Sequence, residues 1–260
     1  MPELDKALSI SLIITITPPT QIITIVISTD YKVMDDLIFT QEPVAQKKYH
    51  LLNVTADHGT LMARKDGVTY KYTLLDVHFH ILAEHTFGGK SYETEMHMVH
   101  IKDREYLAAN NITEKAEDKV NDYLVVGTVF TVDGTTDNAD VARMNIGTGL
   151  KVNDLNLKVY AKPEMSYYHY IGGLTTPDCN QVVNWVVNTN ILKISAKQSQ
   201  TIRKWITGLY PNGNTRVVQA LNNRTIYRID ASIVELTTNA AFLKGNMMML
   251  FSVMIAALFL

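Results

Sequence analysis

A short run of alternating histidines constrains this chain more than any other feature. Residues 77–86 read Val-His-Phe-His-Ile-Leu-Ala-Glu-His-Thr. Successive side chains of a β-strand point to opposite faces, so His78 and His80 are predicted to share a face while Phe79 enters the apolar layer behind it. Two imidazoles side by side supply two ligands of a metal site.

A third histidine follows on the next predicted strand. Gly88-Gly89 is a turn signal, and the chain then returns from Tyr92 to Ile101, which can bring His97 beside the first pair. Three neutral nitrogen ligands with an open fourth position are typical of a catalytic zinc, whereas structural zinc takes four protein ligands, commonly cysteines. The chain has one cysteine. A catalytic rather than structural zinc is therefore predicted.

The plain alternative is that a His-x-His pair on a strand is a pair of surface histidines. The surroundings favour the metal interpretation, because five of the eight histidines fall between His78 and His100. Glu95 stands two residues before His97 on the same predicted face, where it can accept the ring's second N–H and fix its tautomer.

Three ordered blocks carry a family resemblance. The run 78–100 resembles the zinc hairpin of the α-class carbonic anhydrases. The block 170–177, which contains Leu-Thr-Thr-Pro, and Val183-Asn184-Trp185 after it are similar to two further signatures of that family. Residues 214–224 resemble its C-terminal Asn-x-Arg and Asn-Arg strand. By these blocks the chain is identified as a member of the family.

The resemblance implies a mainly β (α+β) fold: one domain around a large, twisted, mostly antiparallel sheet with a few peripheral helices. We expect the catalytic domain to span residues 46–230, after an atypical N-terminal segment, 1–45. A tether and hydrophobic tail would occupy residues 231–260. The implied reaction is reversible hydration of carbon dioxide to bicarbonate and a proton, with Zn²⁺ held by His78, His80 and His97.

The expected mechanism follows from the residue types. Zinc bound by three imidazoles lowers the pKa of a bound water from about 15.7 to about 7, which gives hydroxide at neutral pH. Thr175 can accept the hydrogen bond of that hydroxide if its own O–H is committed to a carboxylate. By resemblance, the carboxylate is Glu84.

The resemblance also assigns a pocket and a proton path. A small apolar substrate calls for apolar walls beside the metal. The matching positions are Val99, Val125, Leu174, Thr176, Val183 and Trp185. His50 resembles the family's proton shuttle, an assignment that suits the pKa of histidine, with Asn53 expected on the same strand face. His58 is the alternative shuttle.

Several positions depart from the family pattern. Asp76 stands where the family usually has a glutamine that orients the first zinc histidine, and a carboxylate can accept the same N–H. The family's first cysteine, the usual disulfide partner of the position held by Cys179, is missing. Residues 12–27 are β-branched and uncharged around Pro18-Pro19, which favours two short edge strands. We therefore expect a truncated or misassigned start.

Charge and periodicity limit the remaining possibilities. The chain has 24 basic and 26 acidic side chains, a balance with no bias toward nucleic acid. A capping box at Ser195 and Gln198 precedes apolar residues at helical spacing, so one packing helix is predicted there. The apolar positions are Ile202, Trp205, Ile206 and Leu209.

The C-terminal tail suggests membrane attachment. Residues 247–260 are 14 uncharged residues, fewer than the ~20 that a spanning helix needs. A terminal apolar tail after small residues fits a glycolipid-anchor signal, with a tail anchor or a packed terminal helix as alternatives. A lipid-anchored protein of the cell surface or secretory pathway is therefore expected, although residues 1–6 are not the basic start of a signal peptide.

Two other functions stay open at this point. A catalytically inactive relative could use the same fold as a binding or structural protein, although the intact ligand set argues against it. A cupin-type metal enzyme would make Glu84 a ligand, because His78-x-His80-x3-Glu84 also resembles a cupin strand. That interpretation leaves the Leu-Thr-Thr-Pro block unexplained.

Overall fold

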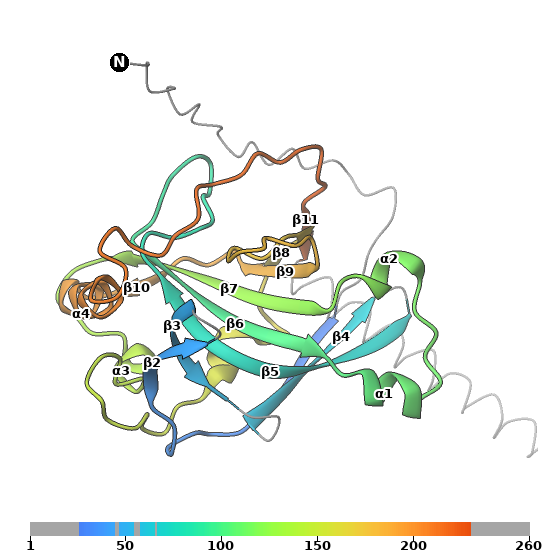
Figure 1. The fold of residues 1–260 in the computed structure, drawn as a ribbon, viewed down its shortest axis with the longest axis horizontal. Coiled ribbons are helices and arrows are strands. Elements are labelled where there is room, and N and C mark those ends of the chain that lie inside the picture. The colour runs from blue at the N-terminus through green and yellow to red at the C-terminus, as the bar shows by residue number, and fades with distance from the viewer. Residues whose placement is uncertain (1–25, 45–46, 55–57, 66, 230–260) are drawn as a thin grey trace, which may run out of the picture.

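The computed structural model describes residues 26–44, 47–54, 58–65 and 67–229. Within them, a single curved sheet of eleven strands runs through the molecule, and short helices lie at its margins (Figure 1). The mainly β, mostly antiparallel fold expected from the sequence is confirmed. Two strand pairs are parallel, β7 with β9 and β7 with β10.

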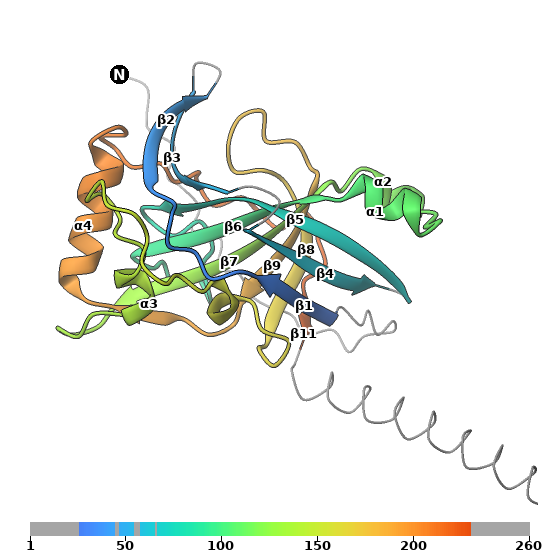
Figure 2. The same ribbon diagram turned by 90° about the horizontal axis from the view of Figure 1, so that it is seen from below.

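The strands are β1 Val26–Tyr31, β2 Phe39–Val44, β3 Lys47–Asn53, β4 Gly59–Lys65, β5 Val68–His80, β6 Thr94–Lys102, β7 Tyr123–Val132, β8 Tyr167–Gly172, β9 Val183–Asn188, β10 Leu192–Ile194 and β11 Tyr227–Ile229. The helices are α1 Arg104–Ala109, α2 Ala116–Lys119, α3 Ala139–Ala142 and α4 Ala196–Thr207, with a 3-10 helix η2 at Leu157–Tyr160. The main strand order is β1-β4-β5-β6-β7-β9-β8-β11. The β2–β3 hairpin joins through β3 to β5 and projects from the body of the sheet (Figure 2).

A register shift in β5 decides which face its histidines occupy. Before the shift, Tyr72 and Leu74 are buried in the main core, and after it Val77 and Phe79 are buried there. The inward positions thus change from even to odd numbers because one extra residue, Leu75, is inserted between Leu74 and Asp76 in the pairing with β6. The bulge therefore turns the even positions 76, 78 and 80 toward the opposite face of the sheet.

The main core lies on the face away from these histidines. It includes fully buried Met96 and Met98 of β6 and Phe130 of β7. A second, smaller apolar cluster lies on the other face. Each face of the sheet thus has its own apolar cluster: the large core on one face, and the smaller cluster beside the histidines on the other.

Helix α4 forms as the sequence predicts. The Ser195 side chain accepts from the backbone N–H of Gln198, and the Gln198 side chain accepts from the backbone of Ser195. Ile202, Trp205 and Ile206 are buried against the core. The capping box and the apolar face thus locate this helix correctly.

The structure tests only part of what the sequence predicts for the two ends of the chain. Residues 214–224, which resemble a strand of the family, run as an irregular segment, and the next strand begins at Tyr227. The edge strands predicted within 12–27 lie outside the described residues except for Val26 and Ile27 in β1. The tether and tail predicted for 231–260 also lie outside them. No helix of the described part has the length and apolarity needed to cross a membrane.

A buried histidine in β8 predicts sensitivity to acid. His169 is 2 % exposed, and its Nδ1–H donates to the Trp185 carbonyl at 2.9 Å. Burial lowers the pKa of His169 to about 4, against about 6.5 in an unfolded chain. Below pH 6.5 the unfolded state binds more protons, so this contribution to stability is complete above that pH and declines as pH falls toward 4. By pH 5 it should have declined by about 2 kcal/mol.

Urea unfolding at pH 7 and pH 5 measures this effect. The His169→Gln variant has an amide that can donate to Trp185 but no group that titrates in this range. Its loss of unfolding free energy between the two pH values should be about 2 kcal/mol smaller than that of the wild type. Equal losses in both proteins would contradict the prediction.

Candidate metal centre

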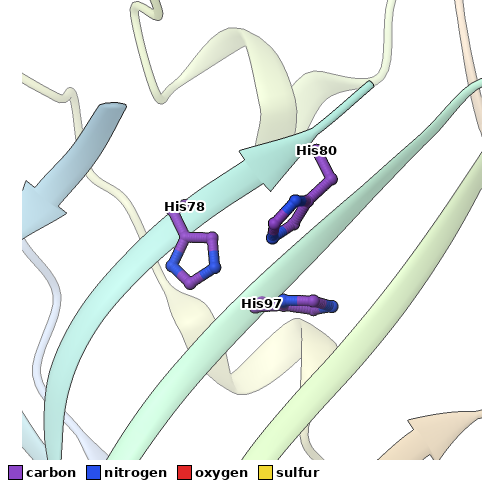
Figure 3. A group of neighbouring side chains, drawn as sticks. All are labelled: His78, His80 and His97. Atoms are coloured by element: carbon purple, nitrogen blue, oxygen red, sulfur yellow. The ribbon is translucent and has the colours of Figure 1, made fainter. Parts of the chain in front are cut away.

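Three histidines of neighbouring strands converge on the face opposite the main core. His78 and His80 lie on β5, and His97 lies on β6 directly opposite His78 (Figure 3). The ring centroids are 5.0 Å apart for His78 and His80, 5.2 Å for His78 and His97, and 4.6 Å for His80 and His97. One nitrogen of each ring lies within 4.8 Å of the others. The structure thus brings together the three ligands proposed from the sequence.

Each ring is held through one nitrogen, which leaves the other nitrogen for a ligand. The Nδ1–H of His78 donates to Asp76 Oδ1 at 2.6 Å, and that of His80 donates to the Asn214 carbonyl at 3.2 Å. For His97 the held nitrogen is Nε2, which donates to Glu95 Oε1 at 2.9 Å. The atoms left to bind a metal are therefore Nε2 of His78, Nε2 of His80 and Nδ1 of His97.

The donor set fits zinc. Nε2 of His80 is buried and has no hydrogen-bond partner among the described residues, and such an orphaned group is costly unless something else binds it. Burial, together with the neighbouring His97 and His78, holds the pKa of His80 well below its usual value. The ring is therefore neutral, as a metal ligand must be. Three histidine nitrogens match the ligand pattern of catalytic zinc, in which three protein ligands leave the fourth position to water.

The Asp76 carboxylate changes the electrostatics of the first ligand. Burial alone would lower the pKa of His78, but the charge and hydrogen bond of Asp76 outweigh it and raise that pKa above its ordinary value. The expectation that a carboxylate here accepts the imidazole N–H agrees with this contact.

A fully buried carboxylate anchors the third ligand. Glu95 Oε2 accepts from the backbone N–H groups of Glu84 and His85, each at 2.9 Å. Its Oε1 accepts from His97 and, at 2.6 Å, from Nδ1–H of His85. Burial would raise the pKa of Glu95, but His85 and His97 lower it far below its usual value. Glu95 is therefore an ionised acceptor whose two oxygens each accept two hydrogen bonds. Its hydrogen bond with His97 fixes the tautomer of that ring.

Glu84 and Thr175 meet beside the histidines. Glu84 Oε1 accepts from the Arg216 backbone N–H at 2.7 Å. Burial raises the pKa of Glu84, while His97, the Arg216 N–H and a hydrogen bond from Thr175 act in the opposite direction. The pair expected from the Leu-Thr-Thr-Pro resemblance is thus adjacent, although 91 residues separate the two in the sequence.

Glu84 lies next to two of the three histidines. Its Oε1 accepts the Arg216 N–H and lies 3.3 Å from Nδ1 of His80, and its Oε2 lies 4.0 Å from Nδ1 of His97. Among the described residues, the groups of side chains whose ligand atoms lie within 4.8 Å of one another do not include Glu84. The cupin interpretation, which makes Glu84 a ligand, is therefore not supported.

An apolar cluster separate from the main core borders His97. The ring centroid of Trp185 lies 4.8 Å from that of His97. Thr176 is half-buried in the loop after Leu174, and its carbonyl accepts from the backbone N–H of Cys179 at 2.8 Å. Five of the proposed pocket residues fall in this cluster: Val99, Val125, Val183 and Trp185, with Leu174 packed against them.

Strand β3 carries the residues of the predicted proton path. In its pairing with β5, Asn53 is opposite Asp76 and Leu51 is opposite His78. His50 is paired with Gln41 of β2. The side chains of His50 and Asn53 lie outside the described part of the structure, so the proton path and the shared strand face stay predictions.

The alternative shuttle, His58, lies immediately before β4. Its Nε2 faces Asp36 Oδ1 at 3.9 Å. This contact links it to the segment between β1 and β2.

Several residues of the site were not assigned a role from the sequence. Asn214 donates to the Phe79 carbonyl at 2.7 Å, and its own carbonyl accepts from His80. Tyr170 donates to Nε2 of His85 at 2.8 Å. A Cβ at Gly127 would lie 2.8 Å from Glu95 Oε1, so the absence of a side chain leaves space for that carboxylate. A lone glycine in a strand of bulky residues signals such an approach.

Cys179, the one cysteine of the chain, is a half-buried free thiol in the loop that follows Thr176. The described residues therefore contain no disulfide.

The fold and the site define a mainly β protein with three histidines gathered on one face of its sheet. The chain belongs to the eukaryotic-type carbonic anhydrase family, whose model matches residues 40–230.

Curated relatives agree with this assignment. The chain is 26% identical over 208 residues to carbonic anhydrase Nec1 of Nesocodon mauritianus, covering 72% of this chain and 69% of that protein. It is 30% identical over 163 residues to a carbonic anhydrase of Nostoc, covering 60% and 53%. For alpha carbonic anhydrase 7 of Arabidopsis thaliana the identity is 28%, with 65% and 60% covered. The chain thus spans between 53% and 69% of the lengths of these relatives.

Solved structures share the fold. A hyperthermostable carbonic anhydrase from a hydrothermal vent chimney has a TM-score of 0.56 and 25% identity, covering 78% of this chain and 80% of that one. A halotolerant carbonic anhydrase from Dunaliella salina has a TM-score of 0.58 and 21% identity, covering 78% and 74%.

Proposed function

We propose that this protein catalyses the reversible hydration of carbon dioxide to bicarbonate and a proton, with zinc held by His78, His80 and His97. The observation that carries the proposal is the arrangement of the three rings, each with one nitrogen held by a neighbour and the other free. Membership of the carbonic anhydrase family supports the same reaction. When bound, zinc supplies a Lewis acid that makes water nucleophilic near neutral pH.

Thr175 and Glu84 orient the attacking oxygen in this proposal. In this proposal Glu84 accepts the Thr175 O–H, so the lone pairs of the Thr175 oxygen remain available. Thr175 can then accept a hydrogen bond from the nucleophile and turn the nucleophile's lone pair toward the carbon. The Arg216 N–H fixes Glu84, which makes this acceptor rigid before substrate arrives.

The apolar cluster beside His97 is the proposed place for carbon dioxide. Val99, Val125 and Trp185 are each at least nine-tenths buried and carry no charge. An apolar wall favours a small neutral molecule over water. Leu174, Thr176, Val183 and Asn53 complete the proposed pocket.

The test of the proposed function is a zinc determination together with a carbon dioxide hydration assay on the purified protein. The proposal requires about one zinc per chain and hydration far above the uncatalysed rate. Zinc without hydration would identify the inactive binding relative. Absence of zinc after exposure to the metal would overturn the ligand assignment.

Proton export is assigned to His50, which stays a prediction. His50→Ala should slow turnover mainly in weak buffer, because a histidine suits proton transfer near neutral pH. Added imidazole should restore the rate, since it can replace the missing base. A variant without this defect would remove His50 from the path, and the same assay on His58→Ala tests the alternative.

A further inference from the structure

Asp76 brings a negative charge to the edge of the metal centre. It follows the bulge of β5 and precedes His78 by two residues, on the same face. Its Oδ1 lies 2.6 Å from Nδ1 of His78, and its side chain is 18% exposed. The resemblance implies a neutral glutamine at this position, so Asp76 adds a charge that the expected pattern lacks.

Three carboxylates contact the histidine group, and they differ in how their charge is balanced. Glu95 accepts four hydrogen bonds, including two from backbone N–H groups and one from His85. Glu84 accepts from the Arg216 N–H and from Thr175. Among the described residues, the hydrogen bond to Asp76 comes from His78. Asp76 therefore acts on the predicted zinc site through its hydrogen bond with the His78 ring.

Two physical effects follow from this contact. An ionised acceptor makes a shorter and stronger hydrogen bond to the ring than a neutral amide, which orients His78 and makes its other nitrogen more basic. The same charge, in a partly buried place of low dielectric, repels an anion at the centre. Carbon dioxide is neutral and is not repelled, whereas bicarbonate is an anion.

We propose that Asp76 makes this centre hold zinc more tightly and bind anions more weakly than a neutral residue at position 76 would. Asp76 is thus a positioning residue for His78 and a determinant of selectivity against anions, bicarbonate and inhibitory anions alike. The inference rests on the proposed zinc function.

The decisive variant is Asp76→Asn, which keeps the shape and an acceptor oxygen but removes the charge. Its zinc dissociation constant, from competition with a chromophoric chelator, should rise 10- to 100-fold. The dissociation constant of thiocyanate, from calorimetric titration of protein saturated with zinc, should fall about tenfold. Both measurements are independent of catalytic rate.

Asp133→Asn is the matched control, because it removes one carboxylate that pairs with Lys193 at the surface. Asp133 immediately follows β7 and lies six residues past Gly127, the partner of His97 in the sheet. Six residues of strand span about 20 Å. Both dissociation constants should stay at their wild-type values in this variant.

Asp76→Ala separates charge from shape. It should weaken zinc further than Asp76→Asn, because the acceptor is also lost, and bind thiocyanate as Asp76→Asn does. A change confined to Asp76→Ala would mean a merely structural role and overturn the proposal. Wild-type protein that binds no zinc would overturn the proposed function as well, whereas zinc binding unaffected by Asp76→Asn overturns this inference alone.

Discussion

Replacing His80 with alanine is expected to remove zinc and all hydration activity. The His80 ring lies close to both other predicted ligands, with its centroid 5.0 Å from that of His78 and 4.6 Å from that of His97. The variant retains two nitrogens, fewer than the three protein ligands of a catalytic zinc site. The wild type should hold about one zinc per chain. Metal analysis after dialysis, with a carbon dioxide hydration assay on the same samples, measures both effects.

The control for this variant is His58→Ala. His58 is also a histidine of the described chain, but its ring faces Asp36 rather than the ligand group. It should keep a full complement of zinc. Full zinc in His80→Ala would show that another set of ligands holds the metal.

The sequence predicts the local parts of this centre well because strand geometry alone relates the residues. His78 and His80 share a face through the period of two, and the glycine turn brings His97 back beside them. The pairing of Glu95 with His97 depends on the same period. All of these relations lie within the stretch from His78 to His97, in the hairpin of β5 and β6.

The bulge in β5 is not among the features predicted above, although the pattern of apolar residues in the sequence indicates it. Apolar residues fall on even positions at Tyr70, Tyr72 and Leu74 and on odd positions at Val77 and Phe79. A change of phase within one strand requires an extra residue. Without it, His78 would face the main core, so the bulge is a condition for the metal centre.

Contacts between distant segments could not be derived from spacing. Asn214 reaches His80 and Phe79 across more than 130 residues. Arg216 reaches Glu84 in the same way. The segment that carries both is irregular, so no periodicity points to their partners, and family resemblance was the available guide. The resemblance misassigned this segment as a strand, because it conveys residue identity better than local conformation.

The remaining large effect concerns Thr175. Thr175→Ala is expected to keep zinc and lose roughly 10²-fold in hydration rate, a loss typical of removing one preorganised hydrogen-bonding group. Thr175 is not one of the three predicted zinc ligands, so the affinity of the variant for zinc should be unchanged. The loss should appear in kcat, since orientation of the attacking oxygen acts on the chemical step rather than on binding.

Thr175→Ser is the control that separates orientation from packing. Serine keeps the hydroxyl, which can donate to Glu84 and still accept from the nucleophile, but lacks the methyl group. It should therefore retain most of the wild-type rate. Glu84→Gln should instead resemble Thr175→Ala, because an amide can donate to the Thr175 oxygen and occupy the lone pair that the nucleophile needs. If Thr175→Ala kept the full rate with zinc bound, the Thr175–Glu84 pair would have no part in orienting the attacking oxygen, and other groups would have to orient it.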